Sequence, residues 1–244
     1  MSFADLHKPG NPLILFNIWD PGSAAVVAKA GAVALATGSA SVAGAWGFAD
    51  GQQMPFDLLL TVVERIAAVS DLPLTVDFEA GYADTTEGVA ANAARLELEG
   101  AKGINLEDGL PPKGGIRPVT EQAALISAIR QVTDLFINAR TDLFLQNPAD
   151  SHAGLMSDAL DRARAYADAG ANGFFAPGLV DPALIEALCR DCPLPVNIMK
   201  SPAAPTISDL SALGVARISF GPFPWRDAMA GLATAYRDQV VNGA

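Results

Sequence analysis

The stretch LTVDFEAGYAD, residues 74–84, begins as an apolar strand and becomes acidic toward its end. Asp77 and Glu79 stand two residues apart, so on a strand both carboxylates would point to the same side. A lone aspartate at the end of a strand is typically a turn or helix-capping residue. Two carboxylates on one face of a buried strand favour another interpretation, and we predict that Asp77 and Glu79 bind a metal ion or a substrate.

Polar residues also follow other strand-like runs of the chain. They are Thr37, Gly38 and Ser39, with Asp50 further along the same loop, then Glu107 and Asp108, Arg140 and Asp142, Asn197, and Ser219. Structural roles stay open for several of them. Glu107 and Asp108 could form a turn before Gly109. Arg140 could serve only as an ion-pair partner of Glu107, and Asn197 could be a hydrogen-bonded core amide.

Several carboxylates at one site would repel one another. Either some of them stay protonated, or a divalent cation lies among them. Oxygen ligands without a nearby His or Cys favour Mg²⁺, or Mn²⁺, over zinc. Because Mg²⁺ keeps several of its waters, we expect one or two direct carboxylate ligands. Arg140 would offer a planar fork to a carboxylate or phosphate, and the backbone amides of Gly38, Ser39 and Ala40 could bind an anion.

An alternation of strand-like and helix-like segments has to position these residues. Apolar runs of strand length lie near 13–19, 33–37, 72–79, 103–107, 135–140, 173–176, 194–199 and 216–219. Segments of helical period lie near 22–30, 56–69, 86–99, 120–131, 154–169, 181–190, 206–213 and 224–238. This alternation predicts an α/β fold with a parallel sheet, and eight such units predict a single (β/α)8 barrel domain over residues 1–244. Catalytic residues of such barrels lie at the C-terminal ends of the strands.

Two regular features support a count of eight units. The helices before the even strands end at glycines, which fits a left-handed C-cap; these are Gly31, Gly100, Gly170 and Gly214. The odd strands carry an Asn or Asp instead, at positions 17, 77, 138 and 197, which are 60, 61 and 59 residues apart. The interior layers of a barrel draw on alternate strands, so such a difference between odd and even strands is expected.

Composition excludes several classes of partner. The net charge of −11 disfavours nonspecific binding to nucleic acid or to an anionic membrane surface. We find no apolar run of about 18 residues and no secretion signal at the N-terminus, so we expect a cytoplasmic protein. Cys189 and Cys192 form a lone C-x-x-C motif without a second pair or a nearby His, and we expect two incidental thiols.

Taken in order, the motifs resemble those of the isocitrate lyase/phosphoenolpyruvate mutase superfamily. ATGSASVAG resembles its substrate-anchoring loop after the second strand, and Asp50 falls where the family has an acidic residue near the metal. VDFEAGY resembles its D-x-D-x-G-Y signature, with Glu79 in place of the second Asp. INLEDGLPPK resembles its I-x-I/L-E-D segment, and Lys113 follows as in the mutase branch. NARTD resembles the motif that supplies the substrate arginine, here Arg140, and LPVNIM resembles the seventh strand of several lyases.

The resemblance implies a barrel that assembles into homodimers or homotetramers by exchange of the last helix, 224–238. It also implies bound Mg²⁺ and a small 2-oxo or 2-hydroxy acid, whose C–C or C–P bond is made or broken next to a pyruvate-like enolate. The expected metal residues are Asp50, Asp77, Glu79 and Glu107. The expected substrate-binding residues are Trp19, Thr37, Gly38, Ser39, Ala40, Arg140, Asn197 and Ser219. The expected catalytic residues are Glu107 and Arg140, with Tyr82 and Lys113 as candidates for the acid or base.

Departures from the family pattern narrow the reaction. The loop PPKGGIRP lacks the Cys and His of isocitrate and methylisocitrate lyases, so an ordinary member of those two classes is not expected. Gly114 and Gly115 replace the polar residues that grip the phosphoryl group in the phosphonate enzymes. We therefore expect an Mg²⁺-dependent lyase-type enzyme of the branch without the cysteine loop. The alternatives are a phosphoenolpyruvate/phosphonopyruvate phosphomutase or hydrolase, and a non-catalytic protein that binds 2-oxo acids.

Overall fold

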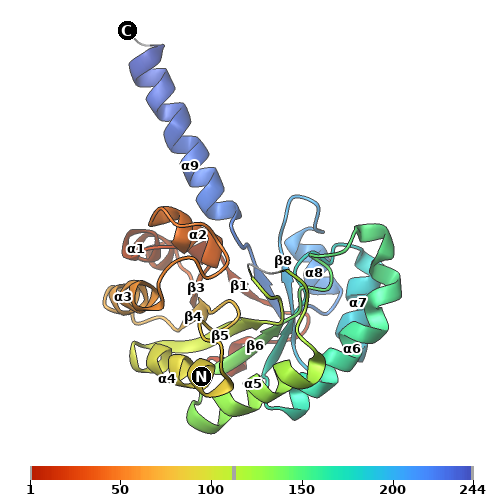
Figure 1. The fold of residues 1–244 in the computed structure, drawn as a ribbon. Coiled ribbons are helices and arrows are strands. Elements are labelled where there is room, and N and C mark those ends of the chain that lie inside the picture. The colour runs from red at the N-terminus through yellow and green to blue at the C-terminus, as the bar shows by residue number, and fades with distance from the viewer. Residues whose placement is uncertain (1, 112–113, 243–244) are drawn as a thin grey trace.

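Parallel strands close into a barrel in the computed structural model, which describes residues 2–111 and 114–242. The strands are β1 (Leu13–Leu15), β2 (Asn17–Ile18), β3 (Leu35–Thr37), β4 (Leu74–Asp77), β5 (Ala101–Glu107), β6 (Phe136–Arg140), β7 (Gly173–Phe175), β8 (Val196–Met199) and β9 (Arg217–Ser219). β1 pairs with β9, and β2 pairs with β3, so the sheet closes at this point. The predicted barrel of parallel strands is confirmed (Figure 1).

The first predicted strand, 13–19, differs from the observed one. It is interrupted at Phe16, which separates β1 from β2. This break lies where the chain leaves its pairing with β9 and begins its pairing with β3. The apolar run 13–19 thus pairs with the last strand through β1 and with β3 through β2, which closes the barrel.

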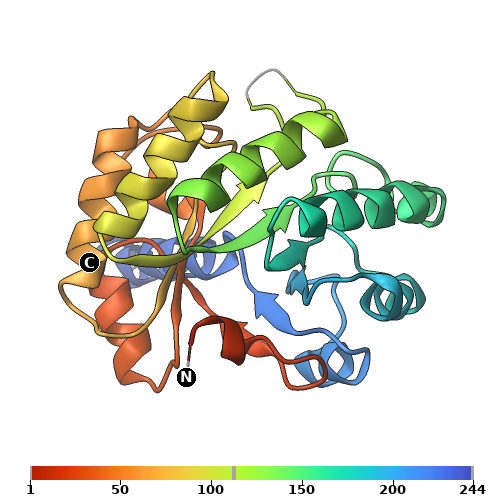
Figure 2. The same cartoon turned by 90° about the horizontal axis from the view of Figure 1, so that it is seen from below.

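Helices surround the strands, as Figures 1 and 2 show. They are α1 (Pro21–Lys29), α2 (Ser39–Ala45), α3 (Phe56–Ala67), α4 (Thr86–Leu98), α5 (Val119–Val132), α6 (His152–Asp168), α7 (Pro182–Asp191), α8 (Ile207–Ala212) and α9 (Phe223–Tyr236). Short turns of other helix types cover Ala4–Leu6, Ala149–Ser151 and Arg237–Val241. Eight of these helices match predicted segments to within a few residues. The exception, α2, has the sequence SASVAGA, whose small residues give no helical apolar period.

Four helices end as the sequence predicts. Gly31, Gly100, Gly170 and Gly214 have φ of +101°, +104°, +102° and +87°, which confirms the left-handed C-caps. Cys189 and Cys192, near the end of α7, are free thiols. No helix within residues 2–111 and 114–242 is long and apolar enough to cross a membrane.

The N-terminal segment closes the barrel at the N-terminal ends of the strands. Phe3 packs there with Leu13, Leu15 and Phe136 in a small apolar cluster. The His7 ring stacks on the ring of Phe136, with 4.0 Å between their centroids. Burial lowers the pKa of His7 to about 3, so this ring is neutral near pH 7. The opposite end of the barrel is left for a functional site.

Candidate active site

A pocket of about 290 Å³ opens at the C-terminal ends of the strands. Its lining includes Gly38, Ser39, Ala40, Asp50, Asp77, Asn105, Arg140 and Ser219, together with Phe175, Pro177, Met199 and Arg226. Several separate strands and the loops after them contribute these side chains. The structure thus brings together residues that lie far apart in the sequence, from Asn17 to Arg226. A space of this size suits a small molecule rather than a macromolecular ligand.

Asp77 is the last residue of β4 and lies in the floor of this pocket. Its backbone N–H donates to Thr37 Oγ1 at 2.9 Å, and its Oδ2 accepts from Ser39 N–H at 3.0 Å. Its Oδ1 is buried and has no hydrogen-bond partner among the described residues. A buried carboxylate oxygen without a donor is unfavourable, so this oxygen fits a bound cation.

Asp50 lines the same pocket from the loop after α2. Its side chain is reachable by solvent, yet partial burial and then repulsion from Asp77 raise its pKa. Both effects would be relieved by a divalent cation between the two carboxylates. Asp50 and Asp77 are therefore the two carboxylates of the pocket lining that could hold a metal.

Arg140, at the end of β6, lies in a cage of carboxylates. Its Nη1 is 2.7 Å from Glu107 Oε2, and its Nε and Nη2 donate to the two oxygens of Asp142 at 2.7 and 3.2 Å. Burial lowers the pKa of Arg140, but Glu107 and Asp142 outweigh it and raise the pKa above its usual value. The ion pair with Glu107 that the sequence left open is present. Arg140 also lines the pocket, so it is a fixed cation at the site.

Glu107 ends β5 and is buried beside Arg140. Burial raises the pKa of Glu107 well above its usual value, and the Arg140 guanidinium only partly offsets this. Glu107 does not line the pocket. Its predicted metal and catalytic roles stay predictions, and its observed contact is with Arg140.

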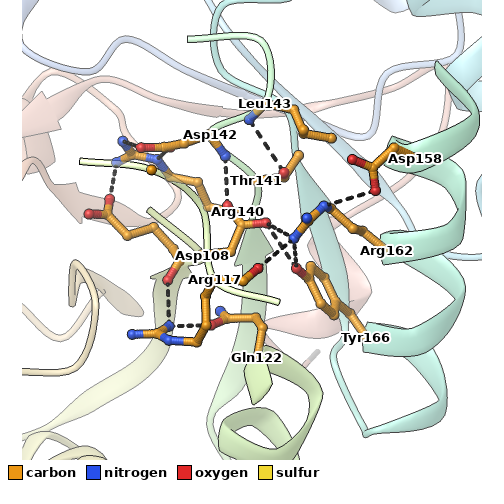
Figure 3. A network of polar contacts seen from close by, with 12 residues as sticks. Asp108, Arg117, Gln122, Arg140, Thr141, Asp142, Leu143, Asp158, Arg162 and Tyr166 are labelled. Atoms are coloured by element: carbon orange, nitrogen blue, oxygen red, sulfur yellow. Dashed lines mark hydrogen bonds and ion pairs between the residues drawn. The ribbon is translucent and has the colours of Figure 1, made fainter. Parts of the chain in front are cut away.

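Asp108 is the centre of a buried network that supports Arg140 from behind (Figure 3). Its Oδ1 accepts from Asp142 N–H at 2.9 Å, and its Oδ2 accepts from Arg162 Nη1 at 3.0 Å and from Tyr166 OH at 2.9 Å. Arg162 Nη1 also donates to Arg117 O at 3.0 Å. α6 thus contacts Asp108, which precedes Gly109, and Arg117, which follows Ile116. Through Asp108 it also positions Asp142, which pairs with Arg140. Asp108 therefore has a structural role.

Glu79 lies beyond the end of β4 rather than on it. Its φ of +48° is left-handed, so the expectation that it continues the strand of Asp77 is wrong. Glu79 Oε1 accepts from Tyr82 OH, and Oε2 accepts from Gln52 N–H at 2.7 Å. Gln52 and Tyr82, with φ of +59° and +54°, are the other two non-glycine residues with positive φ in the described parts of the chain. Glu79, Gln52 and Tyr82, all in a strained backbone conformation, are thus joined by hydrogen bonds beside the pocket.

Glu79 and Tyr82 do not line the pocket. Burial raises the pKa of Glu79 to about 7, although the hydrogen bond from Tyr82 opposes this. Burial and the neighbouring Glu79 raise the pKa of the Tyr82 hydroxyl above its usual value. The metal role of Glu79 and the acid–base role of Tyr82 therefore stay predictions without a contact in the pocket.

We expect the metal-free protein to lose stability as the pH rises, partly because of Glu79. A carboxyl with a raised pKa holds its proton more tightly in the folded state, so its contribution is fully present below about pH 4.5 and is lost through about pH 7. Glu79→Gln mimics the protonated form and should be more stable than the wild type by roughly 3 kcal/mol at pH 8. Urea unfolding in EDTA at pH 5 and pH 8 measures this difference. The exposed Glu64→Gln is the control; equal pH slopes for Glu79→Gln and the wild type would disprove the assignment.

The remaining predicted residues fall in three places. Ser39, Gly38, Ala40 and Ser219 line the pocket. Thr37 and Asn197 are buried beside it, Thr37 as a contact of Asp77 and Asn197 as the acceptor of a 3.4 Å hydrogen bond from Ser219 Oγ. Trp19 lies in a separate apolar groove with Phe16 and Val26. Lys113 lies outside the described residues.

Sequence reasoning missed several residues that build the pocket. Asn17 Oδ1 accepts from the N–H groups of Phe220 and Gly221 at 2.8 and 2.9 Å, which fixes the turn into α9. Asn105 lines the pocket floor and Arg226 its rim. Asn17 carried a signal in the spacing of the odd strands, but nothing in the local sequence marks Asn105 or Arg226.

The predicted metal residues do not form one compact cluster. Within residues 2–111 and 114–242, no group of three or more His, Cys, Asp or Glu side chains is arranged to hold a metal. Asp50 and Asp77 share the pocket, whereas Glu79 and Glu107 contact protein donors. This fits a cation that has few protein ligands and keeps water, as Mg²⁺ often does.

Comparison with known proteins places the chain in a family. The family model described as phosphoenolpyruvate phosphomutase matches residues 3–240. The chain belongs to the phosphoenolpyruvate mutase/isocitrate lyase superfamily. A solved structure from Burkholderia cenocepacia J2315, provisionally named a phosphonomutase, is 53% identical with a TM-score of 0.93 and covers 96% of this chain and 97% of that one.

Two other similar proteins have named activities. The 2-methylisocitrate lyase of Salmonella typhimurium (strain LT2) is 30% identical over 86% of this chain and 78% of its own length. A phosphonopyruvate hydrolase solved in complex with oxalate and Mg²⁺ is 22% identical, with a TM-score of 0.86, and covers 100% of this chain and 89% of that one. The second likeness shows the fold alone.

Proposed function

We propose that the protein is an Mg²⁺-dependent enzyme that makes or breaks a C–C bond next to a pyruvate-like enolate in a small 2-oxo or 2-hydroxy acid. The observation that carries this proposal is the buried Oδ1 of Asp77, which has no partner in residues 2–111 and 114–242 and lies in a small pocket that also holds Arg140. The hydrolase relative with bound oxalate and Mg²⁺ supports it, because oxalate resembles an enolate of pyruvate. Arg140 would hold the anionic group that leaves or adds.

Asp77 and Asp50 are the residues that would hold Mg²⁺, or Mn²⁺ in its place. Arg140 is already paired with Glu107 and Asp142, so it offsets the charge of Asp77 and Asp50 only in part. When bound, the cation would stabilise the negative charge that develops on the enolate oxygen. Ser39 N–H fixes Asp77, and the Gly38–Ala40 turn lines the pocket where the acid would lie.

A second candidate keeps the site and changes the bond to C–P. The relative that is 53% identical and provisionally named a phosphonomutase favours it. Phosphonopyruvate would then be rearranged to phosphoenolpyruvate or hydrolysed. The glycines at 114 and 115 argue against it, because they offer no side chain to a phosphoryl group.

Turnover assays separate these candidates. Oxaloacetate, 2-methylmalate-type acids and phosphonopyruvate would each be incubated with the protein, with and without Mg²⁺, and followed by pyruvate formation and by phosphorus NMR. The proposal predicts Mg²⁺-dependent C–C cleavage of oxaloacetate or of a 2-methylmalate-type acid, and no change in the phosphorus NMR signal of phosphonopyruvate. Oxalate binding without any turnover would identify a binding protein, and the absence of both turnover and metal binding would disprove the proposal.

We also propose that the protein is a homodimer or homotetramer in which α9 is exchanged between copies. α9 projects away from the barrel (Figure 1), and Pro224 is its only buried residue. Its exposed apolar side chains Met229, Leu232 and Tyr236 recur at helical spacing, and Val240 in the following turn continues the series. An apolar groove at its base, lined by Phe16, Trp19, Val26 and Val27, could accept such a helix.

Charges on this face of α9 should break the assembly. We expect Leu232→Glu combined with Tyr236→Glu to reduce the mass measured by light scattering from that of a dimer or tetramer to that of one chain. Each position is more than half exposed in the single chain, so the barrel itself should stay folded. Thr234→Glu, on the opposite side of the helix, is the control. A wild-type protein that runs as a monomer would contradict the proposal.

A further inference from the structure

A buried arginine lies beneath the pocket. Arg217 on β9 is 1% exposed and precedes the pocket residue Ser219 by two positions, so both side chains are on the inner face of the barrel. Arg217 Nη2 donates to Asn105 Oδ1 at 3.0 Å. Its Nε and Nη1 are buried and have no partner among the described residues. Burial lowers the pKa of Arg217 to about 9, which still leaves it charged near pH 7.

Asn105 connects this charge to the pocket. Its Oδ1 accepts from Arg217 Nη2 and also from Asn138 Nδ2 at 2.9 Å. Because an arginine has no acceptor, the amide oxygen of Asn105 must face Arg217. The Nδ2 of Asn105 is therefore the end left to the pocket that Asn105 lines. Within the described residues this nitrogen donates to no side chain or backbone acceptor, so its N–H groups are left for a ligand in the pocket.

A purely structural role does not explain Arg217. A buried charge with a single neutral hydrogen bond is an unfavourable way to fill a barrel interior, and an apolar side chain of similar length would fill it at lower cost. No carboxylate within the described residues accepts a hydrogen bond from Arg217. Asp77, on the strand next to Asn105, is the charge that raises the pKa of Arg217 against burial.

We propose that Arg217 is a positioning residue that acts through Asn105, fixing the Asn105 amide with its N–H groups toward the pocket and holding the pocket floor at a positive potential for an anionic ligand. The ligand class, a carboxylate or enolate oxygen, rests on the proposed function. Arg217 opposes metal binding slightly, because it adds positive charge near Asp77, and favours the acid. Removing it should therefore change the two affinities in opposite directions.

Calorimetric titration of the full chain with Mg²⁺, and then with oxalate at saturating Mg²⁺, tests this. For Arg217→Met we expect an Mg²⁺ Kd lower than that of the wild type and an oxalate Kd about tenfold higher. Arg217→Lys, which keeps the charge, should recover part of the oxalate affinity. In the double variant with Asn105→Ala, the two losses should not add, because they remove one shared interaction.

The other outcomes of these titrations overturn either the inference about Arg217 or the proposed function. An unchanged oxalate Kd in Arg217→Met overturns the inference. Loss of both affinities together with a lower Tm shows a structural role and also overturns it. If the wild type binds Mg²⁺ but not oxalate, the proposed function fails, and the Mg²⁺ titration alone then decides: equal or weaker binding by Arg217→Met overturns the inference. A wild type that binds neither overturns both.

Discussion

Asp77→Asn is expected to weaken Mg²⁺-dependent oxalate binding by about 100-fold or more, because it removes the negative oxygen proposed to hold the cation. The amide oxygen of the substituted side chain could still accept from Ser39 N–H, since the carboxylate and the amide have the same shape. Only Oδ1, which has no partner in the part of the chain that the structure describes, changes in kind, from an anionic acceptor to an amide donor. In EDTA we therefore expect the free energy of unfolding to change by about 1 kcal/mol or less.

Asp71→Asn is the matched control for this prediction. Asp71 is exposed in the loop that leads into the opposite end of β4. The same chemical change there should leave the affinity for oxalate at the wild-type value. Wild-type oxalate affinity in Asp77→Asn, measured at saturating Mg²⁺, would contradict the assignment of Asp77 to the metal.

Arg140→Met is expected to destabilise the protein by about 3–5 kcal/mol, because it leaves two buried carboxylates without their counter-charge. Glu107 and Asp142 both contact this guanidinium at 2.7 Å, and its side chain is only 16% exposed. Oxalate binding should be lost as well, since Arg140 is the cation proposed to hold the anionic group. Urea unfolding and calorimetric titration measure the two effects separately.

Two further variants separate stability from binding. The double variant Arg140→Met/Glu107→Gln removes one of the stranded charges, so it should recover part of the stability and none of the binding. Arg190→Met is the control, because Arg190 forms a similar two-pronged pair with Asp191 but is 66% exposed. Its loss should cost less than about 1 kcal/mol. Equal losses of stability in Arg190→Met and Arg140→Met would contradict the claim that the buried ion pairs of Arg140 with Glu107 and Asp142 stabilise the fold.

The fold was predictable because each strand and most helices have their own periodic signal. Runs such as LTVD and FINAR are long enough and apolar enough to identify strands without a partner. α2 escaped because its small residues pack through shape rather than through an apolar stripe. The break at Phe16 escaped because it depends on two different neighbours, β9 and β3, which no local pattern encodes.

The site was predictable where a polar residue interrupts an apolar strand end. Asp77 and Arg140 were found in this way, and both lie in the pocket. Glu79 was wrongly assigned to a strand, because strand periodicity was assumed past the end of β4, where its φ becomes positive. Arg162 was missed because its partner, Asp108, is 54 residues away, and only the barrel brings the two together.

Crystals of the protein soaked with Mg²⁺ and oxalate provide the most direct measurement. We predict Mg²⁺ within direct contact of Asp77 Oδ1, with Asp50 nearby, and oxalate between the metal, the Gly38–Ala40 turn and Arg140. The account would be contradicted by a metal bound elsewhere, or by an Asp77 Oδ1 that remains without a partner while oxalate occupies the pocket.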